Sequence, residues 1–244
     1  IFWQQPWKHL GVKMTPRQNP SAPNRPTKKQ RLDILVEARG LASSRTQAQA
    51  LIRAGKKDLT VSRSITSTEG DLLYGSGVSN HIMTSWFSQG IVWGVSKVMR
   101  HYTETKQATF EEWSHMAMGL RYRAGAMGIP FMPTRTMMAS DVGGRIDQTT
   151  EMICPFTGEK VLLVPALNPD VALIHVQRCD AYGNAQMDGL PFMDADIAMA
   201  ANRVILTTER IVSNDQIRRA PDRTKIPFVT VDAVVEVPYG CAPH

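Results

Sequence analysis

The 244-residue sequence has no long hydrophobic run, and its acidic residues are almost missing from the first quarter. No apolar stretch approaches the roughly 18 residues that a membrane-spanning helix needs, so we expect no membrane association. The opening residues, IFWQQPWKHLGVKM, also lack the continuous apolar segment and small-residue cleavage site of a secretory signal. These absences predict a cytoplasmic globular protein.

Cysteine is also scarce. Cys154, Cys179 and Cys241 are odd in number and lie far apart, which disfavours a disulfide framework. The histidines between residues 81 and 115 lack metal-ligand spacing with cysteine or acids. We therefore expect reduced thiols and no bound metal.

The positive charge is concentrated at the front of the chain. Residues 1–57 contain 12 of the 28 Lys and Arg residues but only two of the 22 acids, Asp33 and Glu37, which gives a net charge of +10. The remaining 187 residues carry a net charge of −4, so the overall +6 belongs to the front quarter alone. Such asymmetry indicates a separate basic module or tail.

Two different segments make up this basic region. Residues 1–30 are rich in Pro, Gln, Asn and Lys, and we expect a disordered arm because they have too little apolar surface to bury. Residues 31–57, RLDILVEARGLASSRTQAQALIRAGKK, predict two short helices. Gly40 is a suitable end for the first helix, and Ser43 or Ser44 is a plausible N-cap for the second.

The helical segment resembles the alpha-L RNA-binding motif of haemolysin-A-like ribosomal RNA methyltransferases and of many pseudouridine synthases. The resemblance rests on residues 31–33, Gly40, Ser44-Arg45, Ala48, residues 51–52 and Gly55. It implies RNA contacts from Arg31, Arg45, Arg53, Lys56 and Lys57. The alternative is a solvated basic helical pair without an RNA ligand, because a basic face alone supplies only salt-sensitive, unspecific phosphate binding.

From residue 58 onward, short apolar runs alternate with helical stretches. DLTVSRSI predicts a strand, as do residues 160–165, 171–177, 203–208 and 229–236. FEEWSHMAMGLRYRAGAMG has helical periodicity, and Glu111 and Glu112 near its start suit the positive end of the helix dipole. This alternation predicts an α/β fold, with an open, mostly parallel sheet and helices on both faces.

The stretch NPDVALIHVQRCDAYGNAQ combines a buried strand with polar residues. We expect His175 to be a hydrogen-bonded core histidine rather than a catalyst. Asp180 is expected to bind the amides of the turn at residues 181–184, where Gly183 or Asn184 adopts positive φ.

Several ordered motifs identify a second resemblance. VPALNPDVALIHVQRCDAYGNAQ, FMDADIAMAANRVILTTERIVSNDQIRR and VDAVVEVPYGCAPH resemble the α subunit of family I CoA-transferases of the glutaconate type, as do GDLLYGSGV and AGAMGIPFMPTRTMMASDVG upstream. The resemblance covers residues 50–244 and implies an open α/β sheet. It also implies a cytoplasmic hetero-oligomer that moves CoA between an acyl-CoA and a carboxylic acid.

In that family a glutamate of the β subunit, within a Glu-Asn-Gly-like sequence, forms the covalent intermediates. No such triplet occurs here, so the resemblance implies no catalytic residue in this chain and a β subunit as its partner. A coenzyme A thioester enters as a substrate, and no cofactor is permanently bound.

The front end departs from the family. The α subunit normally starts with a strand, a glycine-rich turn and a helix, whereas here the RNA-binding-like helices occupy that place. We expect a fusion or chimera, with acyl-CoA binding impaired by the atypical front end. If so, residues 59–64 form an exposed sheet edge, and Val61 and Ile65 lose apolar cover.

Candidate CoA and substrate contacts follow the predicted element ends, because loops at the carboxyl ends of strands form the usual crevice of an open α/β sheet. They are Gly75, Ser76, Gly77 and Ser79, and then Thr134, Arg135, Ser140 and Asp141. The alternatives are an ordinary turn for the first group and a surface ion pair for Arg135.

The leading hypothesis is therefore a CoA-transferase α subunit. The alternatives are an RNA-binding protein that acts through residues 1–57, or an acyl-CoA hydrolase-type member of the same superfamily.

Overall fold

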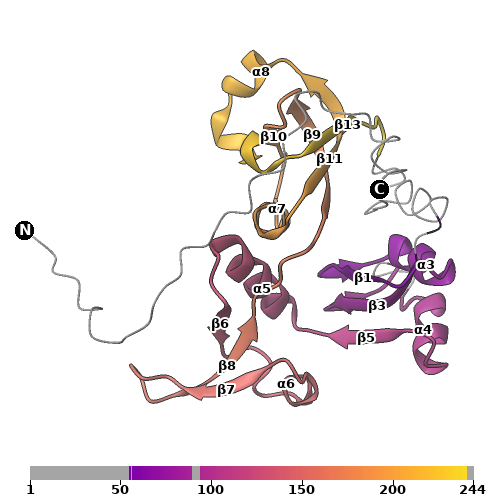
Figure 1. Ribbon diagram of the computed structural model, residues 1–244, viewed down its shortest axis with the longest axis vertical. Helices are drawn as coiled ribbons and strands as arrows, with labels where there is room; N and C mark the ends of the chain where they lie inside the picture. Colours follow the sequence, from indigo (N-terminus) through magenta and orange to yellow (C-terminus); the bar gives the residue numbers. More distant parts are fainter. Residues whose placement is uncertain (1–54, 56, 90–93, 241–244) are drawn as a thin grey trace, which may run out of the picture.

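The computed structural model describes Gly55, residues 57–89 and residues 94–240 (Figure 1). The predicted α/β class is confirmed, since parallel strands alternate with helices along the chain. The strands are divided among four sheets. The predicted arm and almost all of the predicted RNA-binding-like helices fall on residues 1–54 and Lys56, which lie outside the described residues.

The first sheet contains three parallel strands in the order β1-β3-β5. Helices α3 and α4 lie against each other beside it (Figure 1). The bounds are β1 Leu59–Ser62, α3 Thr68–Gly75, β3 Ser79–Thr84, α4 Lys97–Glu104 and β5 Thr109–Glu112, with a short parallel pair formed by β2 Ile65–Thr66 and β4 Trp86–Phe87. Among the described residues, β1 is an outer strand of its sheet.

The helix after β5 begins later than its periodicity predicts. We expected Glu111 and Glu112 near the helix start, but they end strand β5, and helix α5 spans His115–Met127. β5 pairs with β3, and the Ser114 Oγ accepts a hydrogen bond from the Ala117 amide at 3.1 Å, which caps the helix. The expectation was wrong because pairing with β3 holds these residues in an extended conformation.

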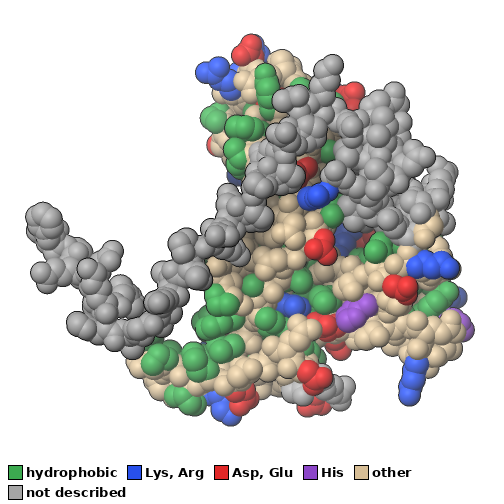
Figure 2. All heavy atoms as spheres, in the orientation of Figure 1, with side chains coloured by type: hydrophobic (Ala, Val, Ile, Leu, Met, Phe, Trp, Pro, Cys, Tyr) green, Lys and Arg blue, Asp and Glu red, His purple; other side chains and the backbone are tan. Residues whose placement is uncertain are grey.

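A third, antiparallel sheet differs from the expected parallel arrangement. Its order is β6-β8-β7, with β6 Phe131–Thr134, β7 Thr150–Ile153 and β8 Lys160–Pro165, and helix α6 Asp141–Arg145 connects β6 to β7. Hydrophobic side chains are exposed over this sheet (Figure 2), including Phe131, Ile153 and Phe156. The strand predicted at residues 160–165 is present, but both its neighbours run opposite to it.

The C-terminal sheet contains five strands in the order β12-β10-β9-β11-β13. The strands β9, β11 and β13 are parallel, and β10 pairs antiparallel with both β9 and β12. The bounds are β9 Ala172–Asp180, β10 Ala185–Gln186, α7 Asp194–Ala200, β11 Val204–Val212, α8 Asn214–Arg218, β12 Thr224–Ile226 and β13 Ala233–Glu236, with 3-10 turns at Pro221–Arg223 and Phe228–Thr230.

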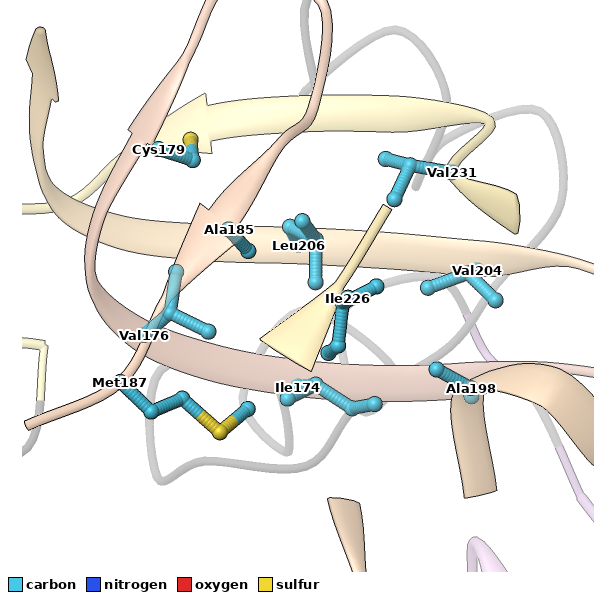
Figure 3. Packing of buried hydrophobic residues seen from close by; sticks show 11 residues of the cluster. Ile174, Val176, Cys179, Ala185, Met187, Ala198, Val204, Leu206, Ile226 and Val231 are labelled. Atoms are coloured by element: carbon cyan, nitrogen blue, oxygen red, sulfur yellow. The ribbon is translucent and has the colours of Figure 1, made fainter. Parts of the chain in front are cut away.

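The core of this sheet consists of apolar side chains from neighbouring strands (Figure 3). Ile174 and Val176 of β9, Leu206 of β11 and Ile226 of β12 are at most 4% exposed, and Ala198 of α7 packs with them. Burial of each such aliphatic side chain stabilises the fold by about 1.5–3 kcal/mol. Helix α7 also packs on α5 and thereby joins this core to the rest of the molecule.

Within the part of the chain that the structure describes, no helix is long and apolar enough to cross a membrane. The same residues contain no group of three or more His, Cys, Asp or Glu arranged to hold a metal ion.

Candidate active site

The carboxyl ends of β1, β3 and β5 bring three polar residues to one edge of the first sheet. Ser64 lies two residues beyond β1, Ser85 directly follows β3, and His115 lies three residues beyond β5. Ligands of open α/β sheets bind outside the carboxyl ends of parallel strands. Acidic and basic side chains are visible between the first sheet and α5, and a histidine is visible over the sheet itself (Figure 2). We name Ser64, Ser85 and His115 the carboxyl-end cluster.

The three side chains of this cluster contact one another. The Nδ1 of His115 lies 2.7 Å from the Ser64 Oγ and 2.9 Å from the Ser85 Oγ. The Ser85 hydroxyl donates to the Ser64 carbonyl oxygen at 2.5 Å, and the two hydroxyl oxygens are 3.2 Å apart. The ring of Phe192 stacks on the imidazole with a centroid distance of 4.6 Å and an interplanar angle of 27°. Ser64 is buried, whereas His115 is exposed.

A buried ionic network joins residues that lie before and after His115 in the chain. Arg121 of α5 is 2% exposed, contacts Glu111 at 3.3 Å and places its guanidinium carbon 4.0 Å from the centroid of the Trp113 ring. It also donates to the Pro165 carbonyl and to Gln148. Burial lowers the pKa of Arg121, and the neighbouring Glu111 carboxylate opposes that shift. The network ties the end of β5 to α5 and β8.

Two carboxyl groups interact with Arg63, which directly precedes Ser64 of the cluster. Glu69 pairs with Arg63 at 2.6 Å, and the Arg63 side chain remains 48% exposed. Asp194 stands at the start of α7. Burial raises the pKa of its carboxyl group, and the charge of Arg63 opposes that shift. Arg63 therefore presents an accessible positive charge directly after β1.

The first predicted contact group lies at the opposite edge of the sheet. Gly75 ends α3, and the Ser76 hydroxyl donates to the Leu73 carbonyl at 3.2 Å. Gly77 has a φ of 71°, and Ser79 begins β3 with its hydroxyl bound to the His81 carbonyl. This turn precedes β3, whereas the carboxyl-end cluster follows it. The role of the group in CoA binding stays a prediction.

The second predicted group lies near the start of α5. Thr134 ends β6, and its hydroxyl accepts from the Thr136 amide at 3.1 Å. The Thr136 hydroxyl is 2.9 Å from that of Ser114, which connects this loop to the residue before His115. Arg135 forms an exposed pair with Glu159 at 3.3 Å, which is the surface ion pair named as its alternative.

The remaining members of the second group border the short helix α6. Ser140 precedes α6 and donates to the Met137 carbonyl at 3.1 Å, and Asp141 is the first residue of the helix. The structure therefore separates the two predicted groups, and only the second is linked to the carboxyl-end cluster. Substrate contacts by Ser140 and Asp141 also stay predictions.

The carboxyl-end cluster itself was missed by sequence reasoning. Ser64, Ser85 and His115 are 21 and 30 residues apart, and no short motif contains two of them. A usable signal existed, because each follows a strand of one parallel sheet. The error in the boundary of β5 concealed it, since the segment before His115 was expected to be helical.

The polar residues of β9 have the structural roles that the sequence predicts. The Asp180 carboxylate accepts three backbone amides of residues 182–184 and two Asn side chains. His175 contacts Thr207 and Glu209, each at 2.9 Å. The predicted hydrogen bonding of both side chains is confirmed, and Gly183 has the expected positive φ of 101°.

The RNA-contact candidates are almost all outside the described residues. Arg31, Arg45, Arg53 and Lys56 belong to that part of the chain, and Lys57 is exposed.

Comparison with known proteins decides the family. A family model described as coenzyme A transferase matches residues 39–237. This chain belongs to the coenzyme A transferase family. The matched region begins within the basic segment 31–57 and includes every residue of the carboxyl-end cluster.

Sequence relatives agree with this assignment. The chain is 33% identical over 209 residues to the A subunit of glutaconate CoA-transferase of Acidaminococcus fermentans, covering 79% of this chain and 65% of the relative. It is 34% identical over 199 residues to the A subunit of 3-oxoadipate CoA-transferase of Pseudomonas knackmussii, covering 79% and 68%. An uncharacterized protein of Archaeoglobus fulgidus is 40% identical over 195 residues, but the chain spans only 43% of its length.

Solved structures of relatives show the same fold. The crystal structure of glutaconate CoA-transferase from Acidaminococcus fermentans has a TM-score of 0.81 at 29% identity, covering 88% of this chain and 77% of that chain. The decarboxylase AibA/AibB has a TM-score of 0.70 at 28% identity, covering 81% and 73%. The similarity to glutaconate CoA-transferase is thus seen in both sequence and structure.

Proposed function

We propose that this chain is the α subunit of an acyl-CoA:carboxylate CoA-transferase whose catalytic glutamate comes from a separate β subunit. The observation that carries the proposal is the similarity to two proteins named as A subunits of CoA-transferases. Glu69 and Glu111 support the proposal, because both carboxylates already accept hydrogen bonds within this chain and are not free to act as the nucleophile. Glu69 accepts bonds from Arg63 and Ser67, and Glu111 from Trp113 and Arg121.

In the proposed reaction the partner's glutamate attacks the thioester carbonyl carbon, and the sulfur leaves as CoA thiolate. The thiolate then attacks the glutamyl carbonyl of the mixed anhydride and releases the first carboxylic acid. The acceptor carboxylate reverses these steps and leaves with CoA. This chain supplies a hydrogen-bond donor and a positive charge for the acyl group, through the Ser64 hydroxyl and Arg63.

We further propose a dicarboxylic acid as the acid substrate. Glutaconate and 3-oxoadipate, which name two relatives, are both dicarboxylic acids. The half-exposed Arg63 guanidinium at the same edge as the cluster is suited to bind the second carboxylate. Its pairing with Glu69 fixes its position while part of the guanidinium remains accessible.

The test compares this chain alone with its complex with the β subunit. The chain alone should not transfer CoA from an acyl-CoA to a dicarboxylic acid, and the complex should. Borohydride reduction of the complex after incubation with acyl-CoA should then modify a glutamate of the partner, which mass spectrometry of the separated subunits would identify. Turnover by the isolated chain, or reduction of one of its own glutamates, contradicts the proposal.

RNA binding is not supported by the family match or by the relatives. It stays a prediction that concerns residues 1–57.

A further inference from the structure

The hydrogen bonds around His115 determine which of its ring nitrogens carries a proton. The Ser85 hydroxyl has one hydrogen, and that hydrogen points to the Ser64 carbonyl oxygen 2.5 Å away. Ser85 Oγ therefore faces the His115 Nδ1, at 2.9 Å, with a lone pair. Only a protonated Nδ1 makes this contact favourable, and it then donates to both hydroxyl oxygens. In the neutral ring, Nε2 carries the lone pair.

The ring is also held in one orientation. Phe192 stacks on one face, and the two serines fix the Nδ1 edge. The backbone of His115 is set by the Ser114 cap of α5. No hydrogen-bond partner of Nε2 is seen within the described residues, and the side chain is exposed. Nε2 thus forms an oriented proton acceptor at the carboxyl ends of three strands.

The proposed transfer of CoA does not need this group. A carboxylate nucleophile has no proton to lose, and the thiolate leaves and returns as an anion. A positioned histidine, in contrast, is the side chain most often used for proton transfer near neutral pH. The cluster therefore points to a second reaction step at the bound acyl group.

We propose that His115 Nε2 reversibly removes a proton from the carbon next to the thioester carbonyl of a bound acyl-CoA. The C–H electron pair moves to the thioester oxygen as an enolate, and the proton forms an N–H bond at Nε2. Return of a proton from Nε2 to the carbon restores the acyl group and the neutral ring. No oxidant or further reactant takes part. This inference rests on the proposed function for the presence of the thioester.

The chemistry selects a substrate class. A neutral imidazole is a weak base, so it acts only where the carbanion is delocalised beyond the thioester itself. Acyl thioesters with a second carbonyl or a carbon–carbon double bond at carbon 3 meet this requirement. Phe192, which stacks on the His115 ring and is 58% exposed, offers an apolar surface at the same site for such a planar acyl group.

The test measures deuterium uptake at carbon 2 of 3-butenoyl-CoA in D2O, by NMR, with the complex of this chain and its β subunit. Exchange above the uncatalysed rate is expected for the unchanged chain. His115→Gln keeps a hydrogen-bonding side chain but removes the base, and it should slow exchange by about 100-fold or more. His101→Gln, in α4, is the matched control and should leave exchange unchanged.

CoA transfer by each variant is measured in parallel, with circular dichroism to check folding. His115→Gln should slow exchange at least about 10-fold more than it slows transfer, and this ratio separates loss of the base from loss of the site. A double variant, Ser64→Ala with Ser85→Ala, should also slow exchange, because nothing then fixes the tautomer.

Absence of exchange by the unchanged complex, or equal exchange by His115→Gln, overturns the inference. If transfer is absent while His115-dependent exchange is present, the proposed function fails and this inference stands. If transfer is present but His115-dependent exchange is absent, this inference fails and the proposed function stands.

Discussion

The first sheet and the C-terminal sheet both contain three adjacent parallel strands, but they treat polar groups differently. At the end of β9, Asp180 is 1% exposed, and both its oxygens accept hydrogen bonds. Beyond the ends of β3 and β5, Ser85 and His115 bind each other, and the exposed His115 has no hydrogen-bond partner for Nε2 among the described residues. Parallel strands thus end in a fully hydrogen-bonded carboxylate in the C-terminal sheet, and in the first sheet they lead to an imidazole with one nitrogen that has no partner among the described residues.

This difference separates stability from function. A saturated buried carboxylate fixes a turn and is costly to remove, because its donors are then left without an acceptor. An exposed nitrogen without a partner contributes little to folding but is available to a ligand. The buried ionic network around Arg121 also stabilises the fold, although it lies next to the carboxyl-end cluster.

The largest effect is expected from Arg121→Met. The change leaves the Glu111 carboxylate without its buried cation and removes the contact with the Trp113 ring. Loss of one partner of a buried ion pair costs about 3–5 kcal/mol of unfolding free energy. Urea unfolding followed by tryptophan fluorescence measures it.

Arg123→Met is the matched control on the same helix. Arg123 pairs with Asp196 at 3.1 Å, but its side chain is 55% exposed, so the cost should stay below about 1 kcal/mol. Equal costs for the two variants would show that the Arg121 network is not the support inferred here.

A smaller loss is expected from Asp180→Ala, about 2–3 kcal/mol, since several donors of the turn lose their acceptor. Burial acts to raise the pKa of Asp180, but hydrogen bonds from Asn184, Asn214 and backbone amides outweigh it and lower the pKa overall. A lowered pKa means that the stabilisation is present at neutral pH and is lost as the pH falls through the folded-state value. The difference in unfolding free energy between the unchanged protein and Asp180→Ala should therefore decrease at acidic pH.

Asp188→Ala is the comparison for this turn. Asp188 pairs with Arg178 and Arg223 near the protein surface, and its side chain is 43% exposed. Its removal should cost less than about 1 kcal/mol. If the loss of unfolding free energy caused by Asp180→Ala does not depend on pH, the role assigned to the carboxylate is wrong.

The smallest effect has the opposite sign. Burial raises the pKa of Asp194, so ionisation of this group destabilises the fold at neutral pH. Asp194→Asn should raise the Tm at pH 7 by about 2 °C. Below the unfolded-state pKa the aspartate is protonated in both states, so the gain should disappear there. Thermal unfolding at several pH values tests this, and a lower Tm at pH 7 would indicate that the charge of Asp194 is stabilising.

Local sequence was enough to predict several features of the C-terminal sheet. The run VALIHV is apolar because Ala172, Ile174 and Val176 of β9 are buried in the core, and the AYGN turn directly follows the end of β9 at Asp180, so strand, turn and the role of Asp180 all depend on neighbouring residues. The strand at residues 160–165 was predicted for the same reason. Its antiparallel pairing was not, because pairing direction depends on β6 and β7 elsewhere in the chain.

The sequence by itself determined the α/β class, the family motifs and the absence of a Glu-Asn-Gly triplet, since each is written in contiguous residues. Only the tertiary structure decided that Glu111 lies in strand β5 rather than near the start of a helix, because pairing with β3 outweighs helical periodicity. The tertiary structure also decided which histidine has hydrogen-bond partners on both ring nitrogens and which has them on one. His175 meets Thr207 and Glu209 from the next strand, whereas His115 meets two serines on one edge and solvent on the other. Such contacts join residues 21 to 51 positions apart, and only the folded sheet brings them within hydrogen-bonding distance.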